Sequence, residues 1–219
     1  MEFFVDSVDP AEILKAKALG LCDGVTTNPS LIAKSGKAHK PAILEILKIV
    51  DGPVCVETIH LDADGIFQEG LEFRKWGREV KREKDVFVKI PVCREGLEAV
   101  HRLSSEKIPT TVTLVFTVGQ ALAAAQAGAS YICPFVGRLD DAGRNGLETI
   151  GRMAAAIRAG GYATKVLVAS IRTAEHVAGS ALAGAHGATL PPKVIAEMLA
   201  DPLTDKGIAQ FLEDAKKFK

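Results

Sequence analysis

The chain has 219 residues, of which 47% are hydrophobic and only 5% aromatic, a composition typical of parallel strands covered by helices. This length allows one large domain with a substantial core, and two domains are possible but not required. Its 27 basic and 27 acidic residues balance, so no global charge favours nucleic acid, a membrane surface or a polyanionic partner.

Short β-branched runs alternate with amphipathic helical stretches from one end of the chain to the other, without a linker or low-complexity tract. The first strand, residues 2–6, precedes a helix that opens at Asp9-Pro10 and ends at Gly20. Further strands are predicted at 24–27, 53–58, 85–90, 111–116, 130–135, 165–170 and 187–190. Further helices are predicted at 41–50, 62–81, 95–105, 119–127, 143–159, 173–183 and 192–199. This alternation predicts an α/β fold, a single (β/α)8 TIM barrel domain over residues 1–219.

Two features of this organisation leave alternatives open. A doubly wound open sheet is the other fold, but no G-x-G-x-x-G loop follows the first strand, and such sheets more often have fewer strands. An additional C-terminal helix, residues 205–218, is left over after the eighth unit. Its apolar residues Ile208, Phe211 and Leu212 recur at helical spacing, so it should pack either on its own barrel or on a neighbouring subunit.

The cysteines and the N-terminal segment predict the compartment. Cys22, Cys55, Cys93 and Cys133 are widely spaced, form no C-x-x-C pair and fall in or beside apolar runs, so we expect reduced, buried thiols. The first residues lack the basic flank and long apolar stretch of a signal peptide, and no later run reaches transmembrane length. We therefore expect a cytoplasmic protein.

Lys89 is the most informative single residue, because it ends the hydrophobic run Asp85-Val-Phe-Val-Lys-Ile-Pro91. Desolvation disfavours an ammonium group, so a lysine held in apolar surroundings can be neutral near pH 7 and nucleophilic toward a carbonyl. Taken alone, however, a lysine at a strand end is better explained as exposed, with its amine in water.

Other polar residues collect at the ends of the predicted strands, where barrels of this type carry their functional groups. Two carboxylates, an asparagine, an arginine and several hydroxyls would face the same mouth as Lys89; they are Asp6, Thr26, Thr27, Asn28, Ser30, Glu57, Thr58, Thr113, Ser170 and Arg172. A single polar residue closing a strand is usually a cap or turn former. The convergence of so many favours catalysis.

Four segments resemble those of transaldolases: Asp23-Gly-Val-Thr-Thr-Asn-Pro-Ser-Leu31, Val88-Lys-Ile-Pro91, Pro134-Phe-Val-Gly-Arg-Leu-Asp-Asp141 and Ala169-Ser-Ile-Arg172. The resemblance spans the whole chain. The short length and the ending Pro202-Leu-Thr-Asp-Lys-Gly-Ile-Ala-Gln-Phe211 are similar to the small transaldolase subfamily, whose relatives include fructose-6-phosphate aldolases. The resemblance implies a cofactor-free class I aldolase of the pentose phosphate pathway that moves a dihydroxyacetone unit between sugar phosphates.

The resemblance also implies catalytic roles. Lys89 would attack the donor ketone and form the Schiff base, and Asp6 would take the proton from the donor hydroxyl as the carbon–carbon bond breaks. Glu57 would move protons through a water that Thr113 also holds. An ionised carboxylate favours the charged amine, so burial must prevail or the proton must be shuttled; the sequence leaves that balance open.

For substrate binding, the resemblance implies that Asn28 holds the dihydroxyacetone hydroxyls, with Thr26 or Thr27 supporting its loop. An Asn-Pro pair is also a common turn signal, and Asn28 could serve both purposes. Phosphate binding maps to Arg138, Ser170 and Arg172, which supply two guanidinium forks and a hydroxyl.

The chain departs from its relatives at a few donor-binding positions. Cys133 stands where larger transaldolases carry a serine, and Thr111 where they carry an asparagine. A thiol is a weaker donor, and Cys133 is better explained as a small residue filling the barrel than as a nucleophile. Fructose-6-phosphate aldolases carry a glutamine and a tyrosine at the positions of Glu57 and Phe135, so the sequence favours transfer over cleavage that releases free dihydroxyacetone.

Two other functions compete with the transaldolase interpretation of the sequence. A non-enzymatic barrel that serves as a binding module is the alternative from a different class, and it predicts an ordinary lysine. A metal-dependent aldolase is disfavoured, since the five histidines lack ligand spacing.

We expect sugar-phosphate substrates, no cofactor, no metal, no nucleic acid and no membrane. By resemblance, the chain would form a homo-oligomer, a decamer built of pentamers in which the last helix docks on a neighbour.

Overall fold

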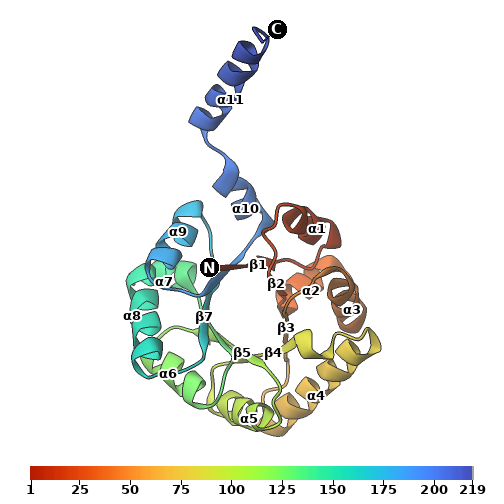
Figure 1. Cartoon of the computed structure of the whole chain (residues 1–219). Helices are drawn as coiled ribbons and strands as arrows, with labels where there is room; N and C mark the ends of the chain where they lie inside the picture. The colour runs from red at the N-terminus through yellow and green to blue at the C-terminus, as the bar shows by residue number, and fades with distance from the viewer. Residues whose placement is uncertain (219) are drawn as a thin grey trace.

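The computed structural model describes residues 1–218, in which eight parallel strands close into one barrel (Figure 1). The strands pair in chain order, and β1 pairs with β8 to complete the ring. The strands are β1 (Glu2–Asp6), β2 (Gly24–Thr26), β3 (Val54–Glu57), β4 (Val86–Pro91), β5 (Thr110–Val115), β6 (Tyr131–Pro134), β7 (Lys165–Val168) and β8 (Gly187–Leu190). The predicted (β/α)8 barrel is confirmed, and the open-sheet alternative is wrong.

Helices surround the barrel, and one further helix extends away from it (Figure 1). They are α1 (Pro10–Ala18), α2 (Pro29–Ser35), α3 (His39–Ile49), α4 (Ala63–Glu79), the 3-10 helix η1 (Glu83–Asp85), α5 (Arg94–Ser105), α6 (Val118–Gln126), α7 (Val136–Asp141), α8 (Gly146–Ala159), α9 (Ala174–Leu182), α10 (Pro192–Leu199) and α11 (Pro202–Ala215). In the described part of the chain, no helix combines the length and apolar character needed to cross a membrane.

The predicted elements differ from the observed ones mainly at their ends. The strand predicted at 165–170 ends at Val168, because Ala169 forms only an isolated bridge and Ser170 adopts a left-handed φ of 59°. The C-terminal helix begins at Pro202 rather than residue 205, since Asp201 caps it, and it ends at Ala215. Element boundaries depend on caps and hydrogen bonds that periodicity does not report.

Two α-helices were not predicted, and both follow strands at the barrel mouth. α2 begins directly after Asn28, whose side chain accepts the Leu31 N–H, and Pro29 occupies its first position. An Asn-Pro pair is a helix-start signal as well as a turn signal, so reading it only as a turn hides the helix. α7 is a single short segment after β6, too brief to show periodicity in the sequence.

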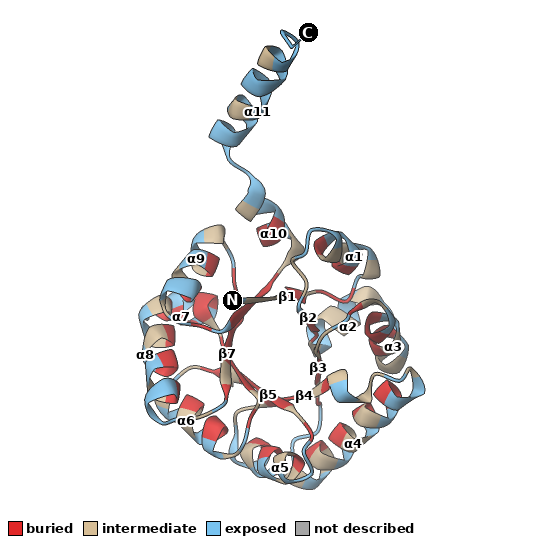
Figure 2. Cartoon of the chain, viewed as in Figure 1, coloured by how far each residue is buried: buried red, intermediate tan, exposed pale blue. Residues whose placement is uncertain are grey.

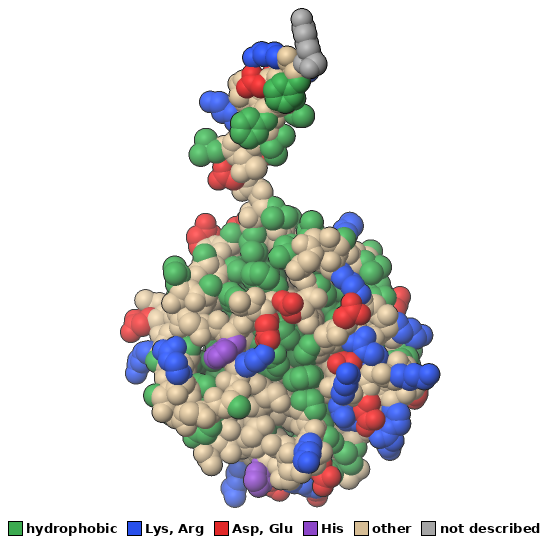
Figure 3. All heavy atoms as spheres, in the orientation of Figure 1, with side chains coloured by type: hydrophobic (Ala, Val, Ile, Leu, Met, Phe, Trp, Pro, Cys, Tyr) green, Lys and Arg blue, Asp and Glu red, His purple; other side chains and the backbone are tan. Residues whose placement is uncertain are grey.

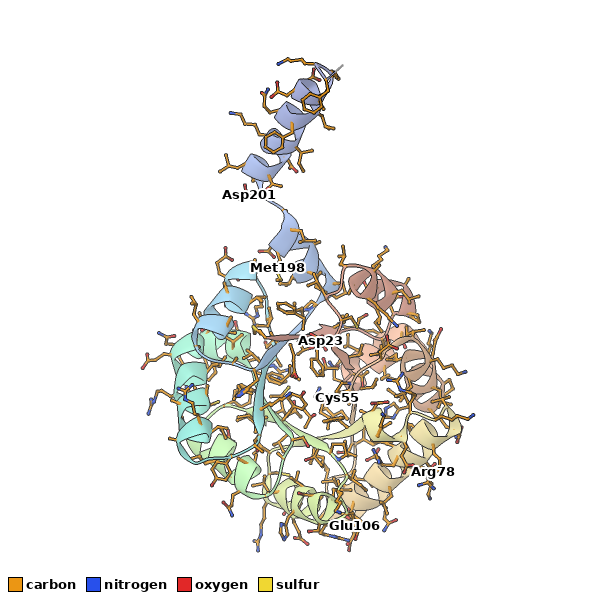
Figure 4. The ribbon with its side chains drawn as sticks, viewed as in Figure 1. Asp23, Cys55, Arg78, Glu106, Met198 and Asp201 are labelled. Atoms are coloured by element: carbon orange, nitrogen blue, oxygen red, sulfur yellow. The ribbon has the colours of Figure 1, made fainter. Side chains whose placement is uncertain are left out.

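Alternation along the strands divides the core into two parts. Residues such as Val54, Val56, Val88 and Ile90 pack outward against the helices, whereas a smaller cluster fills the barrel interior. The interior cluster consists of Phe4, Cys55, Tyr131, Cys133, Leu167 and Ala169, with Phe87 and Phe135 against it. Figure 4 places Cys55 within the ring of strands. Because side chains alternate, a residue two positions further along a strand also points inward, nearer the carboxyl end.

The cysteines do not all follow the prediction. All four are free, and Cys55 and Cys133 are buried as expected, but Cys22 is only half-buried and Cys93 is exposed. Cys93 caps α5, where its sulfur accepts the Gly96 N–H at 3.2 Å, and a capping residue lies at the surface. The expectation of four buried thiols is therefore wrong for two of them.

α11 makes no buried contact of its own. Figure 2 shows it exposed along its length, in contrast to the inward faces of the helices around the barrel. Its large apolar side chains are open to solvent, with Leu203 79% exposed and Phe211 75% exposed. Figure 3 shows hydrophobic side chains along this helix beside charged ones. Of the two alternatives left open by the sequence, packing on its own barrel is wrong for the single chain.

Candidate active site

A cavity of about 190 Å³ lies at the carboxyl end of the barrel strands. Its lining comes from six of the strands and the segments that follow them: Asp6, Thr26, Asn28, Lys89, Cys133, Phe135, Arg138, Ala169, Ser170 and Thr189. Eight of these ten residues were predicted from the sequence. Glu57, Thr113 and Arg172, the other three predicted residues, do not line the cavity and are placed below by their own contacts.

Lys89 lies inside the barrel because it shares the inward face of β4 with Phe87, two residues earlier. Its side chain is only 6% exposed. Nζ donates to the backbone carbonyl of Thr27 at 2.8 Å and lies 2.8 Å from Oε2 of Glu57 on the adjacent strand. The explanation as an exposed strand-end lysine is therefore wrong.

The charge on Lys89 is decided by its neighbours. Burial by itself lowers the pKa of the amine, but the ion pair with Glu57 and the carboxylate of Asp6 outweigh it, so the pKa of Lys89 lies above its ordinary value. The sequence left open whether burial or the neighbouring carboxylates set the pKa of Lys89; the carboxylates have the larger combined effect. The raised pKa favours the ammonium form of Lys89, and Glu57 is the carboxylate in direct contact with it.

Asp6 follows the same inward alternation, two residues after Phe4 on β1. Burial raises the pKa of its carboxyl above the ordinary range, although Lys89 and a hydrogen bond from Thr26 act in the opposite direction. That hydrogen bond joins Thr26 Oγ1 to Asp6 Oδ1 at 2.9 Å. A carboxyl with a raised pKa is better suited to take up and return a proton near neutral pH.

Thr113 is buried on β5, with 1% of its surface exposed, and its hydroxyl has no hydrogen-bond partner among residues 1–218. The pairing of β5 with β6 shifts register between Val112 and Val115, and Leu114 adopts a φ of 60°. A non-glycine residue in this conformation costs about 1–3 kcal/mol and is often found at functional sites. The irregularity falls directly after Thr113.

Asn28 both caps a helix and lines the cavity. Its Oδ1 accepts the Leu31 N–H at 3.0 Å and caps α2, while the residue also lines the cavity. The same loop holds Thr27, whose hydroxyl donates to the carbonyl of Cys55 at 2.8 Å. Among the described residues, Nδ2 of Asn28 has no partner, so it is the atom that can donate to a ligand.

The predicted phosphate-binding residues are only partly brought together. Arg138 and Ser170 line the cavity, and the Arg138 guanidinium lies 4.9 Å from the centre of the Phe135 ring. Arg172 instead forms a two-pronged ion pair with Asp141, whose carboxyl pKa is lowered by it. Gly137 makes this possible, because a Cβ there would lie 2.6 Å from Nε of Arg172.

Burial disfavours the thiolate form of the two cysteines inside the barrel. Burial raises the pKa of the Cys55 thiol to about 11 and raises that of Cys133 further still. Cys55 Sγ lies 3.3 Å from the hydroxyl of Thr111. Both thiols remain protonated near neutral pH; they belong to the cluster inside the barrel, and Cys133 also lines the cavity with Lys89.

Three contributors to the site were not predicted. The Thr27 carbonyl holds Lys89, and Thr189 and Ala169 line the cavity. A backbone carbonyl has no signature in a sequence, and alanine carries no chemistry. A threonine in a short strand is common and gives no signal of its own. The alternation of β8 could have identified Thr189, since it lies two residues after Gly187 on the inward face.

A family model and individual known proteins match this chain over nearly its whole length. The chain matches the family model described as "Transaldolase/Fructose-6-phosphate aldolase" over residues 3–219. It is 49% identical to a "Probable transaldolase" of Sorangium cellulosum (strain So ce56) over 217 residues, covering 99% of this chain and 98% of that protein. A "Probable transaldolase" of Geotalea uraniireducens (strain Rf4) is 48% identical, with 99% of each chain covered.

A solved structure agrees with the fold alone. It is a mutant mandelate oxidase with the monooxide FMN adduct, and it matches with a TM-score of 0.55 and 18% sequence identity. The match covers 88% of this chain and 64% of that chain, so our chain spans less than two thirds of its length. At this identity the likeness concerns the barrel and carries no information about substrate.

Proposed function

Because the chain belongs to the transaldolase/fructose-6-phosphate aldolase family, we propose that it transfers a dihydroxyacetone unit between sugar phosphates through a Schiff base on Lys89. Donors would be sedoheptulose 7-phosphate or fructose 6-phosphate, and acceptors glyceraldehyde 3-phosphate or erythrose 4-phosphate. The observation that carries the proposal is the buried amine of Lys89, 2.8 Å from a carboxylate and inside a cavity lined by two further charged groups, Asp6 and Arg138.

The first step requires a neutral amine. Since the pKa of Lys89 is raised, its proton must leave before attack, and Glu57 at 2.8 Å is the acceptor in direct contact. The neutral nitrogen then bonds to the donor ketone carbon. Loss of water from the carbinolamine needs a proton delivered to its hydroxyl, which Glu57 supplies through a water. The unpartnered, buried hydroxyl of Thr113 supports a place for that water.

Asp6 would act in the second step. Its carboxylate takes the proton from the hydroxyl beside the breaking carbon–carbon bond, an aldose phosphate leaves, and the electron pair moves into the iminium to form an enamine on Lys89. Addition of the enamine to the acceptor aldehyde reverses this sequence, and Asp6 returns the proton. Hydrolysis of the new Schiff base frees the product.

Substrate contacts follow from the cavity lining. The Nδ2 donor of Asn28 would bind the dihydroxyacetone hydroxyls, Cys133 and Phe135 would form the wall beside them, and Arg138 with Ser170 would bind the phosphate. Arg172 would join them only if it released Asp141. The ordinary residues of this site suffice for the chemistry, so we propose that no cofactor or metal takes part.

Borohydride trapping tests the Schiff base. Reduction in the presence of fructose 6-phosphate should add the mass of one reduced sugar phosphate or dihydroxyacetone unit to the peptide that contains Lys89. A Lys89→Met variant is the control and should add none. An unmodified Lys89 peptide from active protein would show that the mechanism is wrong.

The same donor separates transfer from cleavage. Glu57 and Phe135 stand where fructose-6-phosphate aldolases carry other residues, so we propose transfer as the main reaction, in the pentose phosphate pathway of the cytoplasm. Fructose 6-phosphate alone should give little free dihydroxyacetone, and adding erythrose 4-phosphate should give rapid turnover. Fast release of dihydroxyacetone without an acceptor would assign the chain to the aldolases. A non-enzymatic binding barrel is not supported, because the chain belongs to an enzyme family.

We further propose that α11 docks on a neighbouring copy in a homo-oligomer, expected to be a decamer built of pentamers. Its exposed apolar residues, Leu203, Ile208, Phe211 and Leu212, leave an apolar face that nothing among residues 1–218 covers. Deletion of residues 201–219 should lower the mass measured by light scattering. Replacement of Lys206 by alanine, on the same helix, is the matched control and should leave the mass unchanged. An intact assembly after the deletion would contradict the docking.

A further inference from the structure

The hydroxyl of Thr189 lies at the cavity, and the proposed reaction gives it no role. It lies on β8, is 2% exposed and lines the cavity with Asp6 and Thr26. Its Oγ1 forms a short hydrogen bond with Oγ1 of Thr26, and Thr26 in turn bonds to Oδ1 of Asp6 at 2.9 Å. β8 and β2 are the two strands that pair with β1, so Thr189 and Thr26 meet across the strand that carries Asp6, and only Thr26 contacts its carboxylate.

The number of hydrogens on each hydroxyl decides which group donates in each of these two hydrogen bonds. A threonine hydroxyl has one hydrogen, and an ionised carboxylate can only accept. When Asp6 is ionised, Thr26 must donate its hydrogen to Oδ1, so the bond between the two threonines must be donated by Thr189. A proton that Asp6 takes on Oδ2 leaves Oδ1 accepting from Thr26, so the two threonine hydroxyls keep this direction during the reaction.

We propose that Thr189 is a positioning residue, which orients the Thr26 hydroxyl so that it holds Oδ1 of Asp6 and leaves Oδ2 free for the substrate hydroxyl. The inference rests on the proposed function, because it assumes that Asp6 exchanges a proton with the substrate. Hydrogen bonds in a chain strengthen one another in a buried site, so a donor at the far end strengthens the bond that reaches the carboxylate. Thr189 thereby stabilises the ionised form of Asp6 without touching it.

Asp6 is also influenced by other groups that face it, and these must be kept constant. They are Lys89 on β4, Glu57 and Cys55 on β3, and Cys133 on β6. Burial raises the pKa of Asp6, and its hydrogen bond with Thr26 lowers it. Loss of the Thr189 donor weakens that bond, so the acid limb of the activity profile, which requires ionised Asp6, should move to higher pH.

The test compares Thr189→Val with Thr189→Ser. Valine keeps the shape and removes the donor, so kcat should fall about three- to tenfold, as expected for one hydrogen bond, while KM changes less than about twofold. The acid limb of the kcat profile should move to higher pH. Serine restores the hydroxyl, so kcat and the profile should return close to wild type. Borohydride trapping at Lys89 should persist in both variants.

Thr110→Val is the matched control. Thr110 is buried at the start of β5, and its hydroxyl has no partner among residues 1–218, so the same substitution there should leave kcat, KM and the pH profile unchanged. Wild-type kcat and pH profile in Thr189→Val would overturn the inference. So would a loss of activity that serine does not restore, because it would mark a packing role. Absence of transfer and trapping in the wild-type chain would instead contradict the proposed function.

Discussion

The barrel carries a lysine–glutamate pair at each end, and the two pairs differ in their surroundings. At the carboxyl end, Lys89 and Glu57 are 2.8 Å apart and their side chains are 6% and 14% exposed. At the amino end, Lys165 and Glu2 are 2.5 Å apart and their side chains are 44% and 33% exposed, with Tyr131 Oη donating to the same glutamate. The contacts are similar, but only one pair is enclosed.

Enclosure changes what such a pair can do. An exposed pair contributes little, about 0–1 kcal/mol, because water screens both charges. In a buried pair, removing or neutralising one partner leaves the other charge without water to solvate it. Proton transfer at either residue therefore depends on the other. The Lys89 pair also has a second carboxylate, Asp6, within electrostatic reach and a cavity beside it. We therefore expect chemistry at the carboxyl end and stability or assembly at the amino end.

The largest expected difference between the two ends lies in the lysines. Lys89→Met should abolish transferase activity, because no other amine lines the cavity in the described part of the chain. Lys165→Met should keep activity within about twofold of wild type, as expected for a half-exposed pair. Initial rates with fructose 6-phosphate and erythrose 4-phosphate measure both. Equal losses in the two variants would remove the distinction between the ends.

The next largest difference is expected between the two glutamates of these pairs. Glu57→Gln keeps a hydrogen-bond acceptor beside Lys89 but cannot take its proton, so kcat should fall about 10²- to 10³-fold. Glu2→Gln at the amino end should have little effect on kcat. Single-turnover measurement of Schiff-base formation places the defect at the first step. If the rate of that step is unchanged in Glu57→Gln, then Glu57 does not receive the lysine proton.

Within the carboxyl end, the two arginines should not be equal. Arg138 lines the cavity, whereas Arg172 is paired with Asp141. Arg138→Ala should raise KM for sugar phosphates about 10- to 100-fold, the size of one or two lost charge-assisted contacts. Arg172→Ala should raise it less. A larger effect at Arg172 would mean that substrate binding breaks the ion pair, and Asp141→Asn should then lower KM.

The smallest expected effect concerns stability and its dependence on pH. Because burial raises the pKa of Asp6 in the folded chain, the folded state binds a proton that the unfolded state has already released just above pH 3.8. Stability therefore decreases as pH rises from 3.8 through the raised pKa, and the loss persists at pH 7. Asp6→Asn cannot ionise, so its free energy of unfolding at pH 7 should exceed that of wild type.

Denaturant titration at several pH values measures this effect, and the difference should shrink below pH 4. Asp51→Asn is the control of opposite sign, since the hydrogen bond and ion pair with Lys17 lower the pKa of Asp51, and the substitution should bring no gain. A lower stability of Asp6→Asn at pH 7 would show that the charge of Asp6 is better compensated than its burial indicates.

Sequence patterns alone predicted the eight alternating units and the strand-end residues of the cavity, and the family resemblance added Cys133, Phe135 and Arg138. Alternating hydrophobicity fixes which face of each strand is buried, and the barrel brings the carboxyl ends of all strands to one mouth. For that reason Asp6, Thr26, Asn28 and Lys89 could be grouped although they are far apart in the chain, whereas Arg138 was identified only through the family resemblance. The motifs that carry the family resemblance lie at those same strand ends.

Only the tertiary structure decided the contacts that set the chemistry. The charge of Lys89 depends on the distance to Glu57 and on the Thr27 carbonyl, and distances between strands are not encoded in periodicity. The pairing of Arg172 with Asp141 and the hydroxyl chain from Thr189 to Asp6 likewise depend on side-chain directions. A sequence pattern reports which side chains are enclosed; which of them meet, and which proton each holds, depends on packing in three dimensions.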